Sequence, residues 1–169
     1  MLRPERLTVK AQEAVRDAID HARKRGNPVV NDAHLLAVLL AQDEGIVQPL
    51  LRKAGVVVPK LSNQVEAEVA TFPRQEGSEA QPTLDRTLTK VFDRADKLSK
   101  ELGDDYVSTE HLLLALTEEK GTTARRLLED AGMTGKDIRE ALSGVRGSHR
   151  VTDQTPEEKY QALERYTRN

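Results

Sequence analysis

The sequence contains no cysteine and no tryptophan, and aromatic residues make up only 3% of its 169 residues. Without cysteine the chain forms no disulfide and offers no thiolate for catalysis or metal binding, which fits a reducing compartment. Few aromatic rings leave few surfaces on which bases of single-stranded nucleic acid could stack. These absences exclude disulfide scaffolds and thiol enzymes, and they argue against single-strand binding.

Long apolar runs and phosphate-binding loops are missing too. No run approaches the roughly 20 apolar residues that a membrane span needs, and the first residues, MLRPERLTVKAQ, lack the apolar core of a secretory signal. The motifs GxxxxGKS and GxxxxGKT are absent. The formal net charge of -2 comes from interspersed acids and bases, which argues against a nucleic-acid face. We expect a cytoplasmic protein with no membrane or nucleic-acid partner and no ATP-binding site in this chain.

What the chain does contain is one segment written twice. The stretch NDAHLLAVL, from Asn31 to Leu39, returns as STEHLLLAL from Ser108 to Leu116, so that His111 lies 77 residues after His34. The same offset, without a gap, also pairs apolar anchors and glycines: Leu7 with Leu84, Ala18 with Ala95, Gly26 with Gly103, Leu50 with Leu127, and Gly55 with Gly132. Matched apolar and glycine positions specify one packing plan, so the chain is a helical unit repeated once.

Each copy carries the signals of four helices. Apolar residues recur at helical spacing, polar capping residues precede the first turns, and glycines follow the last turns. In the first copy we expect helices from Thr8 to Gly26, after Asn31, from about Ile46 to Ala54, and from about Pro59 to Ala70. In the second copy we expect them from Thr83 to Gly103, after Ser108, at 123–131 and at 136–145. Short extended links at 27–30 and 104–107 join the first two helices of each copy.

The predicted fold is therefore all-α, an eight-helix domain made of two pseudo-twofold four-helix repeats. We assign the first repeat to residues 1–70, a polar surface linker to 71–82, the second repeat to 83–146, and a tail to 147–169. The tail is loop-like at first and then resumes as a short helix, PEEKYQALERY, with a narrow apolar stripe. A short helix of that kind is not stable alone, so we expect the tail to fray after about Gly147.

Two histidines, His34 and His111, are the first candidates for catalysis, because Asp32 lies near one and Glu110 beside the other. Each histidine lies in the first turn of a capped helix at a matched repeat position, where a ring nitrogen can hold the preceding loop. A catalytic pair has no reason to be copied with the scaffold, and neither histidine has metal-binding spacing. We favour the structural role, while a small hydrolase that uses His111 with Glu110 or Asp104 remains the enzymatic alternative.

Two acids of the second copy, Asp104 and Glu110, have no acidic counterpart in the first, which has Asn27 and Ala33 instead. Asp104 can serve as a turn residue and Glu110 can favour the positive end of a helix. The alternative is a partly exposed acidic spot that accepts backbone amides or basic side chains of a partner peptide. Thr8 is likewise a cap first and a candidate contact second.

A candidate apolar groove involves the helix that ends at Gly103. Phe92 and Leu98 lie on its apolar side, whereas the matching helix of the first copy is rich in alanine, and Tyr106 stands where the first copy has Val29. Such a face is core by default. Unequal halves, however, can leave a groove that suits an extended, unfolded segment.

The sequence resembles a known family, the double Clp repeat, and specifically the amino-terminal domain of ClpB-type AAA+ disaggregases. The motifs that carry the resemblance are ERLT at 5–8, HLLAVLL, LLRKAGV, FPR at 72–74, GDDYVSTEHLLLAL at 103–116, LLEDAG, and the final RVTDQTPEEKYQALERYTRN. It covers essentially the whole chain. The FPR segment and the tail favour ClpB over the Clp protease unfoldases.

The resemblance implies the Clp amino-terminal fold and a mobile domain whose tail leads into an ATPase ring, where ATP and magnesium would bind. It implies that Thr8, Asp104 and Glu110 match a surface cluster used in substrate handling, with an apolar groove nearby that includes Leu98. The implied partners are unfolded or aggregated polypeptides, the AAA+ ring of the same chain and a DnaK-type chaperone system. The isolated domain is expected to be a monomer without catalytic residues, metal or cofactor.

Two further interpretations stay open. An adaptor- or degron-recognising domain of a Clp protease unfoldase would bind a folded partner tightly and show no preference for unfolded chains. A structural spacer or gate above the ring would have no affinity for any polypeptide.

Overall fold

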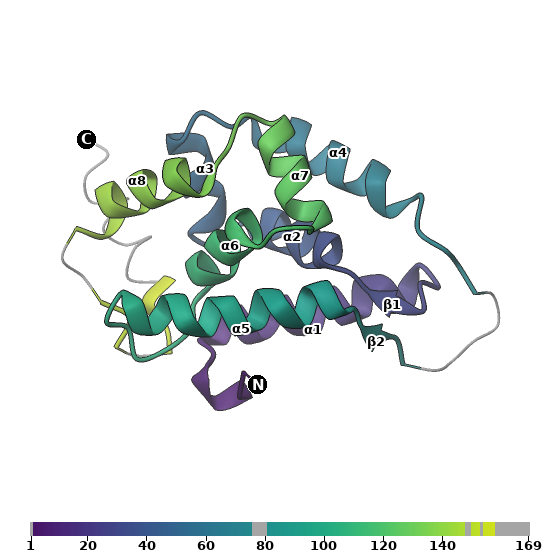
Figure 1. Ribbon diagram of the computed structural model, residues 1–169, viewed down its shortest axis with the longest axis horizontal. Coiled ribbons are helices and arrows are strands. Elements are labelled where there is room, and N and C mark those ends of the chain that lie inside the picture. The colour runs from purple at the N-terminus through teal and green to yellow at the C-terminus, as the bar shows by residue number, and fades with distance from the viewer. Residues whose placement is uncertain (1, 76–80, 148–149, 153, 158–169) are drawn as a thin grey trace.

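The computed structural model describes residues 2–75, 81–147, 150–152 and 154–157, which form eight α-helices, one short 3-10 helix and two short strands. The elements of the first repeat are η1 (Pro4–Arg6), α1 (Val9–Lys24), β1 (Val29–Val30), α2 (Asp32–Ala41), α3 (Val47–Lys53) and α4 (Val58–Val69). Those of the second are β2 (Thr83–Leu84), α5 (Arg86–Glu101), α6 (Thr109–Glu118), α7 (Thr123–Asp130) and α8 (Gly135–Arg146). Figure 1 shows their arrangement.

The helix bounds follow the repeat of 77 residues. Adding this offset to the bounds of α1, α2 and α4 reproduces those of α5, α6 and α8. The predicted caps are also present, since Thr8 Oγ1 accepts the Ala11 N–H at 3.2 Å and Asn31 Oδ1 accepts the Ala33 N–H at 2.9 Å. The all-α fold of two four-helix repeats is thereby confirmed.

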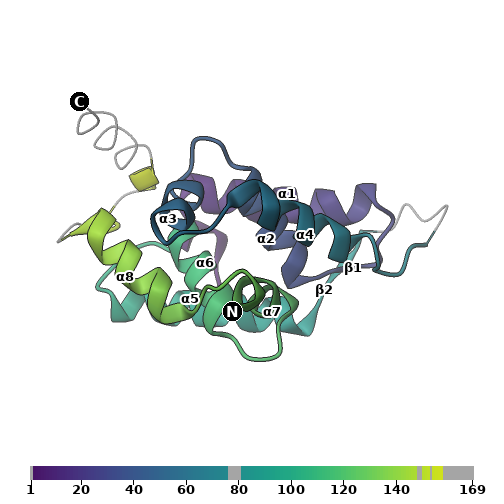
Figure 2. The same cartoon turned by 90° about the horizontal axis from the view of Figure 1, so that it is seen from above.

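The core is centred on the two leucine-rich helices α2 and α6, which pack against each other. Their largest side chains, among them Leu36 and Leu113, are fully buried, as expected for helices that are apolar on nearly every side. The long helices α1 and α5 pack on α2 and α6 respectively. Viewed from above, α1 and α5 lie on opposite sides of this central pair (Figure 2).

The outer helices of each repeat pack on their own central helix and also on the outer helices of the other repeat. Helix α3 of the first repeat packs on α8 of the second, and α4 of the first packs on α7 of the second. A buried carboxylate adds a hydrogen bond between the repeats. Asp32 Oδ1, at the start of α2, accepts the Ala124 N–H, at the start of α7, at 2.7 Å. The two repeats therefore share one core and are not separate subdomains.

The extended links pair with chain segments that sequence periodicity did not indicate. Strand β1 pairs in parallel with β2, with Val29 opposite Thr83 and Val30 opposite Leu84. The matching pair of the other repeat, Leu7 and Val107, forms an isolated parallel bridge. Each link thus holds the start of the other repeat's first helix. Within the described residues, no helix combines the length and apolar character needed to cross a membrane.

Candidate functional site

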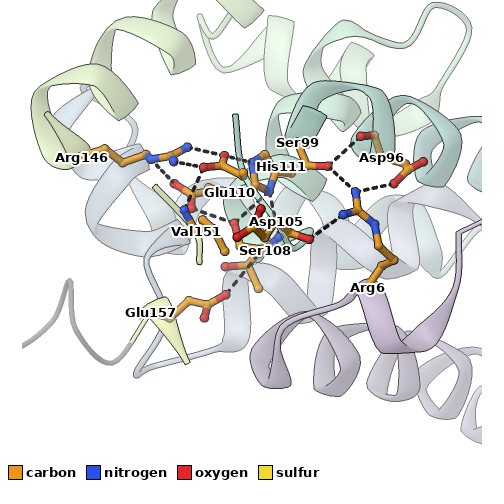
Figure 3. A network of polar contacts seen from close by, with 12 residues as sticks. Arg6, Asp96, Ser99, Asp105, Ser108, Glu110, His111, Arg146, Val151 and Glu157 are labelled. Carbon is orange, nitrogen blue, oxygen red and sulfur yellow. Dashed lines mark hydrogen bonds and ion pairs between the residues drawn. The ribbon is translucent and has the colours of Figure 1, made fainter. Parts of the chain in front are cut away.

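A buried polar cluster lies where the loop after α5 meets the starts of α1 and α6 (Figure 3). Gly103, with a φ of 74°, turns the chain out of α5 in a conformation that side chains disfavour, and the Asp104 N–H then donates to Ser99 O at 2.8 Å. This turn directs the Asp104 carboxylate inward, toward His111 and Arg146. Asp104 is 5% exposed, so its charge is nearly removed from water.

Asp104 is held by three donors from different parts of the chain. His111 Nε2 lies 2.7 Å from Oδ2, Arg146 Nη1 donates to Oδ2 at 2.9 Å while its Nη2 donates to Oδ1, and the Val151 N–H donates to Oδ1 at 2.8 Å. Burial alone would raise the pKa of Asp104, but the hydrogen bonds from His111, Arg146 and Val151 outweigh it and lower the pKa to about 2. Asp104 is thus an ionised anchor that joins α6, α8 and the tail.

His111 holds the loop before α6, as the capping role predicts. Its Nδ1 accepts the Ser108 N–H at 2.9 Å, just as His34 Nδ1 accepts the Asn31 N–H at 2.8 Å. Because Nδ1 is an acceptor here, the proton lies on Nε2 and is donated to Asp104. The structural role predicted for both histidines is confirmed.

The serine, histidine and aspartate of this cluster are arranged in a row that resembles a catalytic triad. Ser108 Oγ lies 3.1 Å from His111 Nδ1, whose ring contacts Asp104 on its other side. Yet Ser108 and His111 are both 0% exposed, Nδ1 already accepts a backbone N–H, and the Ser108 hydroxyl donates to Glu110 Oε1 at 2.7 Å. A substrate cannot reach such a nucleophile, so this geometry does not support the hydrolase alternative. The described residues also contain no group of three acids or histidines placed to hold a metal ion.

Two further acids, Glu110 and Glu157, are buried beside the triad-like row. Thr8 Oγ1 donates to Glu157 Oε1 at 2.9 Å, and the Thr109 N–H donates to the same oxygen at 3.3 Å. Burial raises the pKa of both Glu110 and Glu157 above the usual value of a glutamate. Glu157 therefore ties the tail to the first residues of α1 and α6.

Residues 150–152 and 154–157 form what we call the strap, which runs over this cluster. The Asp105 N–H donates to Val151 O at 2.8 Å, and the Val9 N–H donates to Gln154 O at 2.9 Å. Val151 and Glu157 are both 0% exposed. The sequence predicts fraying after about Gly147, whereas in the structure the strap residues satisfy backbone donors and fill buried space. Most of the predicted tail helix falls in 158–169, outside the described residues.

The linker after α4 plays the same part in the first repeat. Asn27, the counterpart of Asp104, donates from Nδ2 to Pro73 O at 3.0 Å, and the Gln75 N–H donates to Gly26 O at 2.8 Å. The Phe72 ring packs edge-on against the ring of His34, with centroids 5.4 Å apart. The FPR segment thus covers the loop after α1 in the first repeat, as the strap covers the loop after α5 in the second.

The structure brings Thr8, Asp104 and Glu110 together, but not at the surface. The binding interpretation requires a partly exposed acidic spot, whereas these side chains are 0%, 5% and 0% exposed. The correction has a clear physical cause, since Arg146 and the strap cover the carboxylates. Arg146 carries a detectable signal, because the repeat places it where the first copy has the buried Val69. Glu157 has no comparable signal, because the repeat places it opposite Ala80 in the polar linker.

The predicted apolar groove is also corrected. Leu98 is only 3% exposed and belongs to the core, while Phe92 and Tyr106 are half-buried. The surface hollow beside Leu98 is lined mainly by charged side chains, among them Lys90, Arg94, Lys97, Glu118, Glu119 and Arg139. Arg94 Nε lies 2.5 Å from Glu119 Oε2, and Arg139 Nε lies 2.7 Å from Glu118 Oε1. Ion pairs from α6 and α8 therefore make this hollow polar.

Comparison with known proteins agrees with this architecture. The family model of the Clp repeat (R) N-terminal domain matches residues 6–161. The chain belongs to this Clp repeat family. It is 42% identical to chaperone protein ClpB of Corynebacterium diphtheriae over 95% of this chain, and 36% identical to that of Bacteroides thetaiotaomicron over 96%. In both comparisons the chain spans 19% of the relative's length. The predicted membership among ClpB-type Clp amino-terminal domains is confirmed.

Solved structures share the Clp repeat fold. The Hsp104 N-terminal domain from Candida albicans superposes with a TM-score of 0.80 at 22% identity, covering 89% of this chain and 98% of that one. The N-terminal domain of the ClpV1 ATPase from E. coli superposes with a TM-score of 0.74 at 20% identity, covering 90% and 93%. The ClpV N-domain in complex with a VipB peptide gives a TM-score of 0.66 at 23% identity, covering 83% and 86%.

Proposed function

We propose that this Clp repeat domain engages substrate for an ATP-dependent, ClpB-like disaggregase by binding unfolded or aggregated polypeptide. The observation that carries the proposal is the match to ClpB chaperones over 95% of this chain. The buried state of the only triad-like row in the described residues supports a binding role and not a catalytic one. ATP and magnesium then belong to the ring domains of the full-length protein, which feed captured chains into a hexameric pore.

An exposed edge of the short parallel sheet offers a surface for an extended chain. Val29 and Leu84 are 37% and 42% exposed, although both are large apolar residues in strands. The N–H groups of Thr83 and Asp85 point to the first strand, because they donate to Pro28 O and Val30 O. Alternation along a strand therefore turns the backbone of Leu84 toward the opposite edge. Addition of a strand there would read backbone groups and tolerate many sequences, as a general chaperone requires.

The domain would act in the cytoplasm, as a monomeric unit joined to the ring by its tail and working with a DnaK-type system. Binding by one copy is expected to be weak, with a dissociation constant that is micromolar or higher. Six copies around a hexamer raise the effective concentration of sites, so weak single sites can still retain a polypeptide.

A second candidate function is recognition of one defined peptide or adaptor, as in a Clp protease unfoldase. The specific observation that favours it is the structurally similar ClpV N-domain, which was solved with a VipB peptide. Defined recognition predicts tight binding to a folded or sequence-specific partner and no preference for unfolded chains.

An NMR titration of the chain with a carboxymethylated, permanently unfolded protein tests the proposal, with the native form of the same protein as control. We expect chemical-shift changes with the unfolded form only. Leu84→Ser should weaken binding several-fold. Val57→Ser, at a 65% exposed residue that caps the start of α4 and is not part of the sheet, should leave binding unchanged. Tight binding to a folded adaptor supports the second candidate, and absence of shifts with either form indicates a spacer or gate.

A further inference from the structure

The charges on helices α1 and α5 are reversed between the two repeats. The helices correspond residue for residue at the offset of 77, and six of the matched positions carry a charge in both. Five of these six have opposite signs, and the exception is Arg23, which is matched by Lys100. The reversed pairs are Glu13 with Lys90, Arg16 with Asp93, Asp17 with Arg94, Asp20 with Lys97, and Lys24 with Glu101. The two helices therefore present the same spacing of charges with opposite signs.

Three of the reversed positions form a line along each helix. Glu13, Asp20 and Lys24 follow one another at i, i+7 and i+11, which places them within an arc of about 40° on one side of α1. The buried alanines of α1 lie on the other side, and none of these three charged residues is buried. We call this line the α1 stripe. The α5 stripe is the matched line of Lys90, Lys97 and Glu101, all exposed.

The charges of both stripes are available to a partner. The three lysines of the two stripes take part in no ion pair with any described residue. The two acids of the α1 stripe contact only a base one turn away on their own helix, since Glu13 Oε2 lies 3.5 Å from Lys10 Nζ and Asp20 Oδ1 lies 2.7 Å from Arg23 Nη2. Exposed pairs of this kind contribute little stability, so these carboxylates can accept another cation.

The stripes cannot meet within one copy, because α1 and α5 lie on opposite sides of the central helices (Figure 2). They can meet between two copies. With α1 of one copy parallel to α5 of another and in register, every stripe residue faces its matched position and therefore an opposite charge. In an antiparallel arrangement Glu13 would face Glu101 and Lys24 would face Lys90, which are pairs of like charge. Electrostatics thus favours the parallel arrangement.

We propose that the α1 stripe of one copy of this chain binds the α5 stripe of a second copy, with the two helices parallel and in register. The contact joins two different faces, so it can repeat from copy to copy and closes into a ring where the rotation permits. Exposed ion pairs make it weak between free chains, and it gains strength where copies are held close together. It uses neither the buried polar cluster nor the exposed sheet edge, and it is independent of what the domain captures.

Paramagnetic broadening between two chains in NMR spectra detects a weak contact of this kind. The chain has no cysteine, so Arg86→Cys provides a single attachment point for a nitroxide, one turn before Lys90. The spin-labelled chain is mixed at millimolar concentration with an isotope-labelled wild-type chain, whose signals are recorded. We expect broadening of the amide signals of residues 9–13, at the start of α1, and much less at residues 21–24. Salt at 1 M, where the Debye length is about 3 Å, should abolish the broadening.

Charge reversal on both partners distinguishes this contact from an effect on the fold. Lys90→Glu with Lys97→Glu on the spin-labelled chain should reduce the broadening about tenfold, because two attractive pairs become repulsive. Glu13→Lys with Asp20→Lys on the recorded chain should do the same. When both double variants are mixed, the broadening should return, because each pair again has opposite charges.

The matched control is Lys60→Glu with Lys136→Glu on the spin-labelled chain, which changes the net charge equally at exposed positions of α4 and α8. It should leave the broadening unchanged. Absence of broadening between wild-type chains at low salt overturns the inference, and so does failure of the two double variants to restore it. An equal loss in the control would mean that net charge alone governs the contact, and broadening at residues 21–24 in place of 9–13 would rule out the parallel register. Loss of binding to unfolded protein leaves the inference standing.

Discussion

Asn27 and Asp104 occupy the same position of the two repeats, and each side chain lies within hydrogen-bonding distance of Nε2 of its repeat's histidine, at 2.9 Å from His34 and 2.7 Å from His111. The first contact is to a neutral amide, and the second is to a carboxylate that also forms an ion pair with Arg146. The difference follows Arg146, which stands where the first repeat has Val69. The same contact to the histidine therefore only holds the loop in the first repeat. In the second repeat, the Asp104 side chain also binds α8 and the strap.

Replacing Asp104 by asparagine should lower the free energy of unfolding by about 3 kcal/mol, because the buried Arg146 guanidinium loses the carboxylate that accepts two of its N–H groups. Urea unfolding followed by circular dichroism measures the change. Asp105→Asn, at the exposed neighbouring residue, is the control and should stay within about 0.5 kcal/mol of the wild type. Similar values for both variants would show that the buried ion pair contributes little.

The stabilisation from Asp104 should depend on pH. Its pKa is about 2 in the folded chain, against 3.8 for an ordinary aspartate. A lowered folded pKa means that the stabilisation is fully present above pH 3.8 and is lost as pH falls from there through about 2. The difference in unfolding free energy between wild type and Asp104→Asn should accordingly shrink across this window. A constant difference down to pH 2 would contradict the assignment.

His34 should remain neutral well below the usual range of histidine. Burial, assisted by the nearby charges of His21 and Arg25, lowers its pKa from 6.5 to about 4. The stabilisation from its neutral ring is complete above pH 6.5 and is lost as pH falls toward 4, because the unfolded chain takes up the proton first. The ring signals of His34 in an NMR titration should show a midpoint near 4. A midpoint near 6.5 would mean that the ring is open to water.

The strap should close more tightly on mild acidification. Burial raises the pKa of Glu157, and the groups around it are Glu110 and Thr109 of α6 and Thr8 before α1. Arg146 and Asp104 act on the neighbouring Glu110. Protonation of a carboxyl with a raised pKa favours its buried state, so protection factors at the Val9 and Asp105 amides should increase as pH falls from neutral toward the ordinary pKa of a glutamate. Glu157→Gln, which does not titrate, should show no such increase.

Because α3 packs on α8 and α4 packs on α7, the two repeats share contacts and should unfold in a single transition. Leu36→Ala and Leu113→Ala lie at matched positions in the central helices, and each should cost about 2–5 kcal/mol because each leaves a cavity in the shared core. Circular dichroism and NMR peak intensities should report the same midpoint for each variant. Separate midpoints for first-repeat and second-repeat signals would show that the repeats unfold independently.

Local signals in the sequence determined the helices, their caps and their duplication. The Thr8 and Asn31 caps and the histidine clamps join residues only two or three positions apart, so residue type and spacing are enough to predict them. The offset of 77 residues, read from His34 and His111, then carried each assignment from one repeat to the other. Periodicity reports which face of a helix is buried, and that information is contained in neighbouring residues.

Only the tertiary structure decided what covers the candidate site. Asp104 is buried by Arg146, 42 residues away, and Thr8 is bound by Glu157, 149 residues away. The hollow beside Leu98 became polar because Glu118 and Arg139 approach it from α6 and α8. Whether a carboxylate meets water, an arginine or another carboxylate depends on which distant segments the chain brings to it, and no periodic pattern encodes that choice.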